Sequence, residues 1–310
     1  MYQHLIACLA IRRRIATIAS LGFLIFGAHV VHAKDSASAA FSFSHIKGNL
    51  HLVSNKGGNI AVSTGKDGLL LVDNGNADEA ELLASALKNF ASDKTLAYII
   101  NTHWHDDHSG ANNLLGHNAD IIAHDNVRRY LSEHRTVPMF NMEFDALEPQ
   151  GLPTITFPNQ VNLYINGDLV SLKHYGAGHS DSDAVVYFTA ENVVHMGDSM
   201  VYPMYPFIDL EHGGHALKYI ETIHAVLKEI DDQTIVIPGH GNLTDKAGVQ
   251  EFLVMLESTV EEVRQMKIAG LSNEQAQAQG LDPKWEPWNK SKITEDIWID
   301  EIYRSLDLTL

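Results

Sequence analysis

Short apolar runs dominate the first part of the chain and predict successive β-hairpins. The runs span residues 41–46, 48–53, 59–63 and 68–72, and turn-forming residues separate them. Apolar runs of this length, bounded by Asn, Gly and Asp, are typical of antiparallel strands joined by tight turns.

The spacing of apolar positions changes to that of a helix over residues 77–90. Asn76 or Asp78 is expected to cap its first turn, because a short polar side chain there can accept a hydrogen bond from a free backbone N–H. Further predicted elements are a buried strand at 96–100, a strand at 119–123 and a helix at 126–134.

A second β-rich set follows, with predicted strands at 154–157, 161–165, 169–174, 184–188 and 193–196. Later predicted elements are a helix at 214–230, a short strand at 234–237 and a mainly helical region at 246–310, with capping-box spacing at 272–275. No internal repeat or proline-rich linker divides the two sets. The pattern therefore predicts one α/β domain over residues 34–310, in which two sheets pack inside helices.

Residues 1–33 have the order of a secretory signal. Three arginines at 12–14, without any acidic residue, precede an apolar stretch that ends in Val31-His32-Ala33. This order of basic, apolar and small residues is typical of a cleaved signal peptide. An uncleaved membrane anchor is the alternative, although about 17 apolar residues is short for a span that needs roughly 20. We expect a bacterial periplasmic or secreted protein with no stable membrane association after cleavage.

Charge and cysteine content exclude several kinds of partner and site. The 310 residues include 22 Lys and Arg against 39 Asp and Glu, a net charge of −17. This acidity argues against nucleic acid as a partner, because phosphate binding needs a basic surface. The only cysteine, Cys8, lies in the predicted signal, so the mature chain has no thiol for a disulfide or a cysteine-rich zinc site.

Histidine is abundant, with 18 residues, and its densest group is the run HWHDDH at 103–108. Alternate side chains of an extended segment share a face, so His103 and His105 can point together, and the following turn can bring Asp107 and His108 to the same cavity. Imidazole and carboxylate are the ligands that zinc uses when thiolates are absent. Burying such groups without a partner costs free energy, so the run predicts a metal site.

Three further polar residues each follow an apolar strand and a glycine. They are His179 in GAGHS, Asp198 in HMGDS and His240 in PGHG. Loops at strand ends are a common place for a rigid sheet to hold metal ligands. We expect these residues to complete the site.

The series HWHDDH, GAGHS, HMGDS and PGHG resembles the metallo-β-lactamase superfamily of di-zinc hydrolases, over about residues 45–245. The resemblance implies a four-layer αββα sandwich with the site at one edge of its two sheets, and it leaves residues 246–310 as a helical C-terminal extension. It also implies two Zn²⁺ ions per chain, with Asp198 bridging them. The first ion would be held by His103, His105 and His179, and the second by Asp107, His108 and His240.

The reaction implied is hydrolysis by a hydroxide that the two zinc ions share, since zinc lowers the pKa of water toward ~7. The hydroxide would open a cyclic amide or ester of a small molecule, and Asp107 would orient the water or accept its proton.

The substrate class depends on residues near the second zinc. Some zinc β-lactamases carry a cysteine where this chain has Asp198-Ser199. A bridging Asp198 is similar to glyoxalase-II-like thioesterases and lactonases, whereas His108, Ser199 and the run GHSDSDAVVYF at 178–188 resemble exported β-lactamases. A β-lactam is the leading expectation, and a lactone or thioester is the alternative.

Two hypotheses of another class stay open. The chain can be a non-catalytic metal-binding protein that keeps the fold, although all seven ligand positions are present. It can also be an oxidoreductase that holds iron, because nitrogen and oxygen ligands do not specify zinc alone.

Other residues near the motifs have both a structural and a functional interpretation. A wall for an apolar substrate, or core packing, is expected from Met200, Tyr202, Met204, Tyr205 and Phe207. A mobile lip over the site is the hypothesis for Met139, Phe140, Met142 and Phe144, and anchoring of the C-terminal helices is expected from Trp285, Trp288 and Trp298.

Several remaining polar residues are assigned mainly to structure. His195 is expected to be a strand residue, His212 and His215 loop or helix-start residues with substrate contact as the alternative, and His117, His124 and His134 surface residues. Asn112 and Asn113 are expected to serve the turn or helix after the ligand run. Asp181 and Asp183 either hydrogen-bond near His179 or belong to a solvated turn.

Overall fold

The first of two sheets is built from the N-terminal half of the chain. The computed structural model describes residues 41–54 and 57–308, so the predicted signal at 1–33 lies outside the described residues. In these ranges the strand order is β1 (Ser42–Lys47), β2 (Leu50–Ser54), β3 (Ile60–Gly65), β4 (Gly68–Val72), β5 (Leu96–Ile100), β6 (Asp120–His124) and β9 (Ile155–Phe157). Strands β1 to β4 are antiparallel hairpins, as predicted, and β4, β5, β6 and β9 run parallel.

The second sheet comes from the following segment. Its strand order is β10 (Gln160–Ile165), β11 (Asp168–Lys173), β12 (Val185–Phe188), β13 (Val193–His195) and β15 (Ile235–Ile237). Two small pairs lie outside the main sheets: β7 (Arg135–Val137) with β8 (Met142–Phe144), and β14 (Val201–Tyr202) with β16 (His240–Gly241). The pairing of β14 with β16 joins the segments that follow Asp198 and Gly239.

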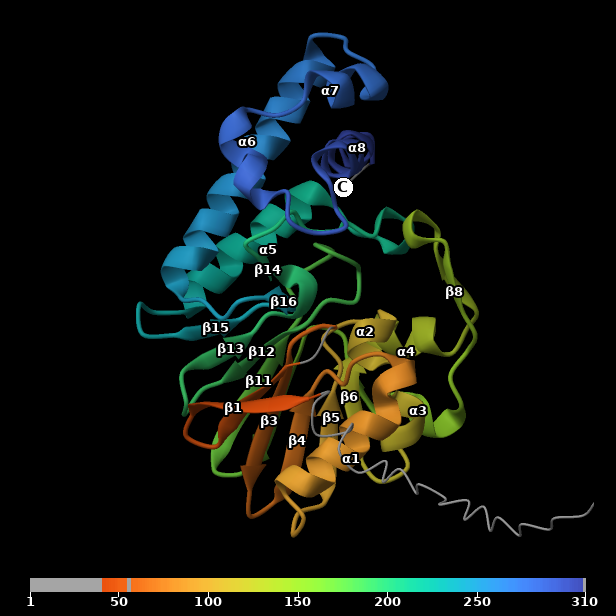
Figure 1. The fold of residues 1–310 in the computed structure, drawn as a ribbon, viewed down its shortest axis with the longest axis vertical. Helices are drawn as coiled ribbons and strands as arrows, with labels where there is room; N and C mark the ends of the chain where they lie inside the picture. The colour runs from red at the N-terminus through yellow and green to blue at the C-terminus, as the bar shows by residue number, and fades with distance from the viewer. Residues whose placement is uncertain (1–40, 55–56, 309–310) are drawn as a thin grey trace, which may run out of the picture. The chain divides into compact units, whose positions relative to one another are not determined.

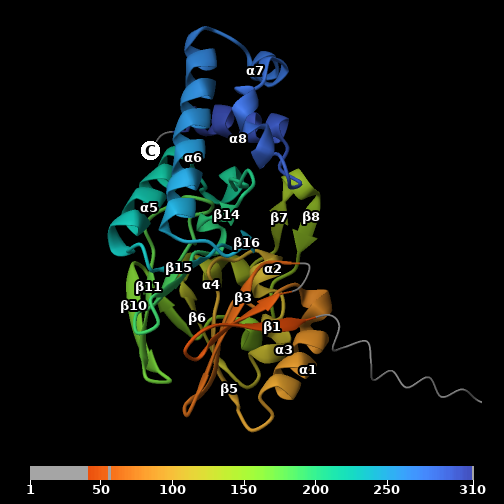
Figure 2. The same ribbon diagram turned by 60° about the vertical axis from the view of Figure 1, so that its left-hand side comes forward.

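Helices cover the outer face of each sheet (Figures 1 and 2). Next to the first sheet lie α1 (Ala80–Phe90), α2 (Asp106–Ser109), α3 (Asn112–Leu115) and α4 (Asp125–Leu131). Next to the second lie α5 (Ala216–Glu229) and α6 (Lys246–Ile268), followed by α7 (Asn273–Gln279) and α8 (Glu295–Ser305). None of the helices in the described ranges combines the length and the apolar character that crossing a bilayer requires.

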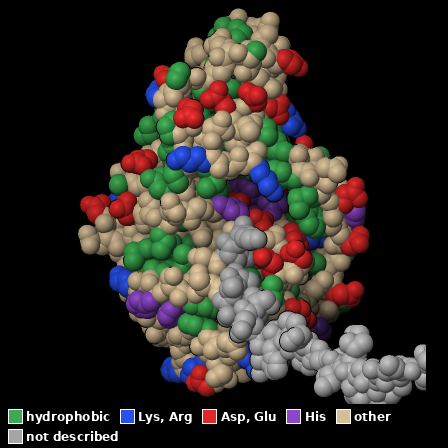
Figure 3. Space-filling view, in the orientation of Figure 1, with side chains coloured by type: hydrophobic (Ala, Val, Ile, Leu, Met, Phe, Trp, Pro, Cys, Tyr) green, Lys and Arg blue, Asp and Glu red, His purple; other side chains and the backbone are tan. Residues whose placement is uncertain are grey.

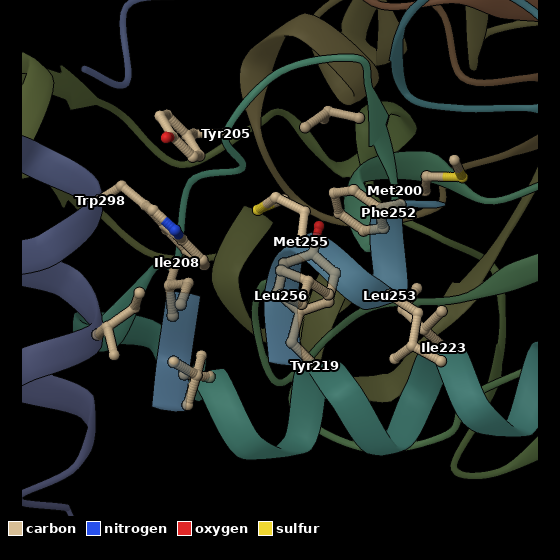
Figure 4. Packing of buried hydrophobic residues seen from close by; sticks show 14 of the residues in the cluster. Met200, Tyr205, Ile208, Tyr219, Ile223, Phe252, Leu253, Met255, Leu256 and Trp298 are labelled. Carbon is tan, nitrogen blue, oxygen red and sulfur yellow. The ribbon is translucent and has the colours of Figure 1, made fainter. Parts of the chain in front are cut away.

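Alternating side chains of the strands build three apolar layers. Leu70 faces the second sheet and contributes to a cluster with Leu172 and Val186, whereas its neighbour Leu71 packs on the opposite face with Leu83 of α1. The outer face of the second sheet shares a third cluster with α5 and α6. Figure 4 shows the part of this cluster in which Tyr219 and Ile223 of α5 lie near Phe252 of α6. Successive residues of a strand point to opposite faces, so this layering follows from the period of two. The predicted arrangement of two sheets inside helices is confirmed.

The start of α1 and the position of β9 differ from the sequence prediction. Neither Asn76 nor Asp78 caps α1, which begins at Ala80 after a 3₁₀ turn. The backbone N–H of Ala77 lies instead 3.4 Å from the Asp106 carboxylate, which reaches it from another loop. Strand β9 was predicted in the second β-rich set. It instead extends the first sheet by pairing with β6, although it follows β7 and β8 in the chain.

His124 was predicted at the surface and is buried instead. Its Nδ1 accepts a hydrogen bond from Asn126 N at the start of α4, and its ring stacks on that of His174 at 4.1 Å. A helix cap and an aromatic partner offset the cost of burying the ring.

The C-terminal helices are anchored by buried aromatic and polar side chains. Trp298 of α8 is fully buried, donates its Nε1–H to Thr259 Oγ1 at 3.0 Å, and stacks near Tyr205 (Figure 4). Glu301, one turn further on, is also fully buried and accepts a hydrogen bond from Ile208 N at 3.0 Å. The anchoring predicted for the tryptophans is confirmed, as is the capping box of α7 at Ser272 and Gln275.

Glu301→Gln should make folding stability less dependent on pH. Burial raises the pKa of the Glu301 carboxyl well above its usual range, so the folded chain keeps a proton that the unfolded chain releases above about pH 4.3. Wild-type stability therefore falls as pH rises, and glutamine, which keeps the acceptor oxygen, removes that dependence. Urea unfolding from pH 5 to pH 8 should show the variant gaining stability relative to wild type. The exposed Asp296→Asn is the control, and a Glu301→Gln difference that is constant with pH would contradict the prediction.

Candidate metal centre

The predicted ligands meet where the strands of both sheets end. His103, His105, Asp107 and His108 follow β5, His179 lies between β11 and β12, Asp198 follows β13, and His240 follows β15. Loops after β5 in one sheet and β13 and β15 in the other therefore converge at one edge of the sandwich. Figure 3 shows histidine side chains in a hollow on this face, beside hydrophobic side chains.

Three histidines form the first group. The Nε2 atoms of His103 and His179 lie 3.1 and 2.9 Å from Nδ1 of His105. All three side chains are almost fully buried. These nitrogens lie close enough together to hold one metal ion.

Acceptors behind the rings fix which nitrogen carries the hydrogen. His105 Nε2 lies 2.9 Å from the Asp209 carboxylate, and His179 Nδ1 lies 2.8 Å from the Phe207 carbonyl oxygen. Because both oxygens can only accept, these nitrogens donate, which leaves a lone pair on His105 Nδ1 and on His179 Nε2. Lone pairs that face one another at about 3 Å repel, so a cation between them stabilises the arrangement.

Asp107, His108 and His240 form the second group. His240 Nε2 lies 3.1 Å from Asp107 Oδ2 and 3.3 Å from His108 Nε2. The other nitrogen of His108, Nδ1, donates to Asp73 at 2.7 Å. These three side chains are close enough for a second ion.

Asp198 lies between the two groups. Its Oδ2 is 3.8 Å from His179 Nε2, while its Oδ1 is 3.3 Å from His108 Nε2 and 3.5 Å from His240 Nε2. Oδ1 is buried and accepts no hydrogen bond from the described residues. A buried carboxylate oxygen without a donor is costly, and a metal ion at this position would satisfy it.

Two glycines allow the close approach of these loops. Gly197 has a positive φ of 50°, and a Cβ there would lie 2.5 Å from Thr102 Oγ1. At Gly239 a Cβ would overlap Asp198 Oδ1. A side chain at Gly197 would therefore displace Thr102, and one at Gly239 would displace Asp198.

The two groups differ in charge. Burial lowers the pKa of His179 to about 4 and that of His103 well below its usual value, so both imidazoles are neutral. Burial also disfavours charge on His240 and His108, but the carboxylates of Asp107 and Asp198 outweigh it, raising the pKa of His240 to about 10 and that of His108 well above its usual range. The first group is therefore neutral, whereas in the second group protons on His108 and His240 balance the carboxylates. A metal ion bound by the second group would replace these protons, because a ligating imidazole is neutral.

Two buried acids that support the histidines were not singled out in the sequence. Asp209 holds His105, and Asp73, directly after β4, accepts hydrogen bonds from Thr102 N and Thr102 Oγ1, both at 2.8 Å, besides His108. Asp73 adopts a positive φ of 64°, unusual for a residue other than glycine. Its place at a strand end resembles that of the predicted ligands, whereas no local signal marks Asp209.

Some of the other polar residues named in the sequence analysis support the site, and others have only a structural role. Asp183 is buried and accepts hydrogen bonds from His179 N and Ser180 N, while Asp181 pairs with Arg129. His195 is a buried strand residue whose Nε2 lies 3.0 Å from Asn59 O. His212 bonds Asp209, His215 caps α5, and His117 and His134 are exposed. Asn112 bonds Asn74 and Asn101, and Asn113 accepts from Glu148 N, which supports the turn.

A cavity of about 500 Å³ opens onto the second group. Asp107, Asp198 and His240 line it together with His105. Its apolar wall comes from two segments predicted in the sequence: Phe140, Met142 and Phe144 around β7 and β8, and Met204, Tyr205 and Phe207 after β14. Met200 is instead fully buried in the core.

The family is shown by the match between this sequence and a model of a known protein family. A model of the metallo-β-lactamase superfamily matches residues 55–240, more than half of the chain. The chain belongs to this superfamily. The predicted fold, a mixed α/β metallo-β-lactamase sandwich with additional C-terminal helices, is thereby confirmed. Among curated proteins, none matches the chain significantly.

Solved structures with the same fold include lactamases and a sulfatase. A metallo-β-lactamase from Pontibacter korlensis is 17% identical with a TM-score of 0.58, and the alignment covers 70% of this chain and 99% of that one. The DIM-1 metallo-β-lactamase is 20% identical with a TM-score of 0.55, covering 70% and 97%.

The sec-alkylsulfatase Pisa1 from Pseudomonas sp. is 15% identical with a TM-score of 0.64, and the alignment covers 86% of this chain and 50% of the sulfatase. This chain therefore spans half the length of the sulfatase. The alignment includes more residues of this chain than the whole of residues 1–240 could supply. It must therefore include part of the C-terminal helices, so the likeness in fold extends into them.

Asp73→Ala should destabilise the protein by about 3–5 kcal/mol. The variant leaves three buried donors on Thr102 and His108 without their acceptor, and it places alanine at a positive φ. Asp73→Asn keeps an acceptor and should cost less, about 1–3 kcal/mol. Urea unfolding of the protein measures both values. Asp93→Ala, which removes an exposed acid, should change stability by less than about 0.5 kcal/mol. An Asp73→Ala variant as stable as this control would show that Asp73 does not support the site.

Proposed function

We propose that the protein is a metal-dependent hydrolase that opens a cyclic amide or ester of a small molecule, with a β-lactam as the leading substrate. The observation that carries the proposal is the position of Asp198. Its two carboxylate oxygens face two separate groups of ligand-type side chains, and one of them is buried without a hydrogen-bond donor.

The residues fit a pair of zinc ions. His103, His105 and His179 would hold one ion, and Asp107, His108 and His240 the other, with Asp198 between them. The set contains only imidazole and carboxylate donors. His105, His108 and His179 each have their second ring nitrogen bound to an acceptor that orients the ring. When bound, zinc supplies Lewis acidity, which lowers the pKa of water and polarises a carbonyl.

The chain itself supplies a proton acceptor and a binding wall. The carboxylate of Asp107 is one-third exposed and lines the cavity. In the metal-free chain burial opposes its ionisation, but protonated His108 and His240 outweigh this effect and lower its pKa; a bound cation would take over the role of these protons. An ionised carboxylate facing the cavity can orient a water and accept its proton at Oδ2. The aromatic and methionine side chains that line the same cavity would hold the apolar part of the substrate and exclude water.

A lactonase or glyoxalase-II-like thioesterase is the second candidate. The observation that favours it is again Asp198, which lies between the two groups in a chain that has no cysteine after Cys8 to take that place.

We also propose export to the bacterial periplasm, after removal of residues 1–33.

His103→Ala should remove metal and activity together. The change deletes one of three converging nitrogens of the first group, so zinc bound after dialysis should fall from two ions per chain to one or fewer. The value of kcat/KM should fall by at least about a hundredfold. Metal analysis and turnover of the same samples measure both. His117→Ala, at an exposed histidine, is the matched control. Normal zinc content and activity in His103→Ala would refute the site, and less than one zinc per wild-type chain at saturation would favour a non-catalytic protein.

A substrate panel should distinguish the two candidate reactions. Purified residues 34–310, with metal quantified, would be assayed against nitrocefin, a γ-lactone, a glutathione thioester and a secondary alkyl sulfate. We expect nitrocefin turnover that EDTA abolishes and added zinc restores. Turnover confined to the lactone or thioester would support the second candidate. Turnover of the sulfate ester alone would contradict both, because both candidate reactions are attacks on a carbonyl carbon, which a sulfate ester lacks.

A further inference from the structure

We infer that Lys292, which the C-terminal extension brings to the cavity, binds an anionic group of the substrate. The substrate class would then be an amphipathic anion, whose charged end lies at Lys292 and whose apolar body lies along the apolar side chains of the same cavity. The inference rests on the proposed function for the chemistry at the metal centre, but the binding of the anion can be tested without turnover.

Lys292 is the one lysine or arginine among the described residues that line the cavity. Its side chain is exposed, and no ion pair between described residues includes it. Three acids line the same cavity: Asp107 and Asp198 pair with His108 and His240, and Asp106 accepts a hydrogen bond from Ala77 N. The ammonium group is therefore available to a ligand.

The backbone that carries Lys292 is held firmly. The next residue, Ile293, is buried in the core of the C-terminal helices, and its N–H donates to Ser291 Oγ at 3.0 Å. Just before it, Lys290 N donates to the Trp288 carbonyl at 2.9 Å. A lysine on a fixed segment loses little backbone entropy on binding, which favours recognition over a chance surface position.

Much of the rest of the cavity lining is apolar. Phe140, Met142 and Phe144 come from the region of β7 and β8, and Met204 and Phe207 from the segment after β14. Methionine and aromatic side chains provide adaptable contact for an apolar group without specifying its shape.

Long-range charge makes a local cation more important. The chain has a net charge of −17, so an anion approaching it meets a repulsive field. A fixed positive charge at the mouth of the cavity offsets this repulsion at the place where binding occurs. Neutral molecules of the same shape would gain nothing from it, so Lys292 distinguishes anionic from neutral substrates.

A matched pair of fluorescent probes tests this distinction. 8-Anilinonaphthalene-1-sulfonate and N-phenyl-1-naphthylamine share an apolar body and differ in the sulfonate. Equilibrium titration of the zinc-loaded protein with each probe gives its Kd. Lys292→Ala should raise the Kd of the sulfonate about three- to tenfold and leave that of the neutral probe within twofold. Lys290→Ala, at an exposed lysine outside the cavity lining, should change neither. Phe140→Ala should weaken both probes, because both need the apolar wall.

Turnover gives a second reading. Mono-4-nitrophenyl glutarate and 4-nitrophenyl valerate present the same ester with and without a carboxylate. Lys292→Ala should raise KM for the glutarate by a similar factor, with kcat little changed, and leave the valerate unaffected.

Three results would overturn the inference: equal effects of Lys292→Ala on the charged and neutral probes, no effect on either, or no binding of the sulfonate to wild type. Probe binding insensitive to Phe140→Ala would overturn it too. Absence of ester turnover by the zinc-loaded wild type would instead count against the proposed function, and the probe titration would still decide the role of Lys292.

Discussion

Converging lone pairs at the edge of the sandwich are the constraint on which the site depends. His103, His105 and His179 bring ring nitrogens to within 2.9–3.1 Å, and acceptors behind His105 and His179 fix the lone pairs inward. Such an arrangement is repulsive without a cation. The surrounding fold must therefore hold the rings in place, and much of the second layer of the site, including Asp209 and the Phe207 carbonyl, has this role.

The C-terminal helices contribute to the site through one loop. Residues 205–209 hold His105 and His179 on one side, and on the other side Glu301, Trp285 and Trp288 bind the same loop through Ile208 N, the Tyr205 hydroxyl and Tyr205 N. The extension also supplies Lys292 and Ile293 to the cavity wall. The extension thus supports the loop that orients His105 and His179, and it also forms part of the cavity wall. Loss of the extension would therefore disturb both.

Most strands could be predicted because each carries its own signal. Alternation and turn residues located β4 at Gly68–Val72 and β5 at Leu96–Ile100 without error, and the other strands of the two main sheets to within a few residues. The short strands β7, β8, β14 and β16 were not predicted. The start of α1 and the burial of His124 could not be predicted, because Asp106 and His174 act on them from distant parts of the chain. The addition of β9 to the first sheet was also set by packing between segments that the sequence separates.

The sequence by itself determined the candidate ligands: seven histidine and aspartate side chains, in strand-end loops, with glycines at 197 and 239 that permit close approach. Those features are local, so residue type and spacing reveal them. Tertiary structure alone decided which acids orient the rings and what lines the cavity. Asp73 reaches His108 across 35 residues, and Asp209 reaches His105 across 104. Only the packing of two sheets and the C-terminal helices brings such residues together, because no local pattern encodes a contact between segments so far apart.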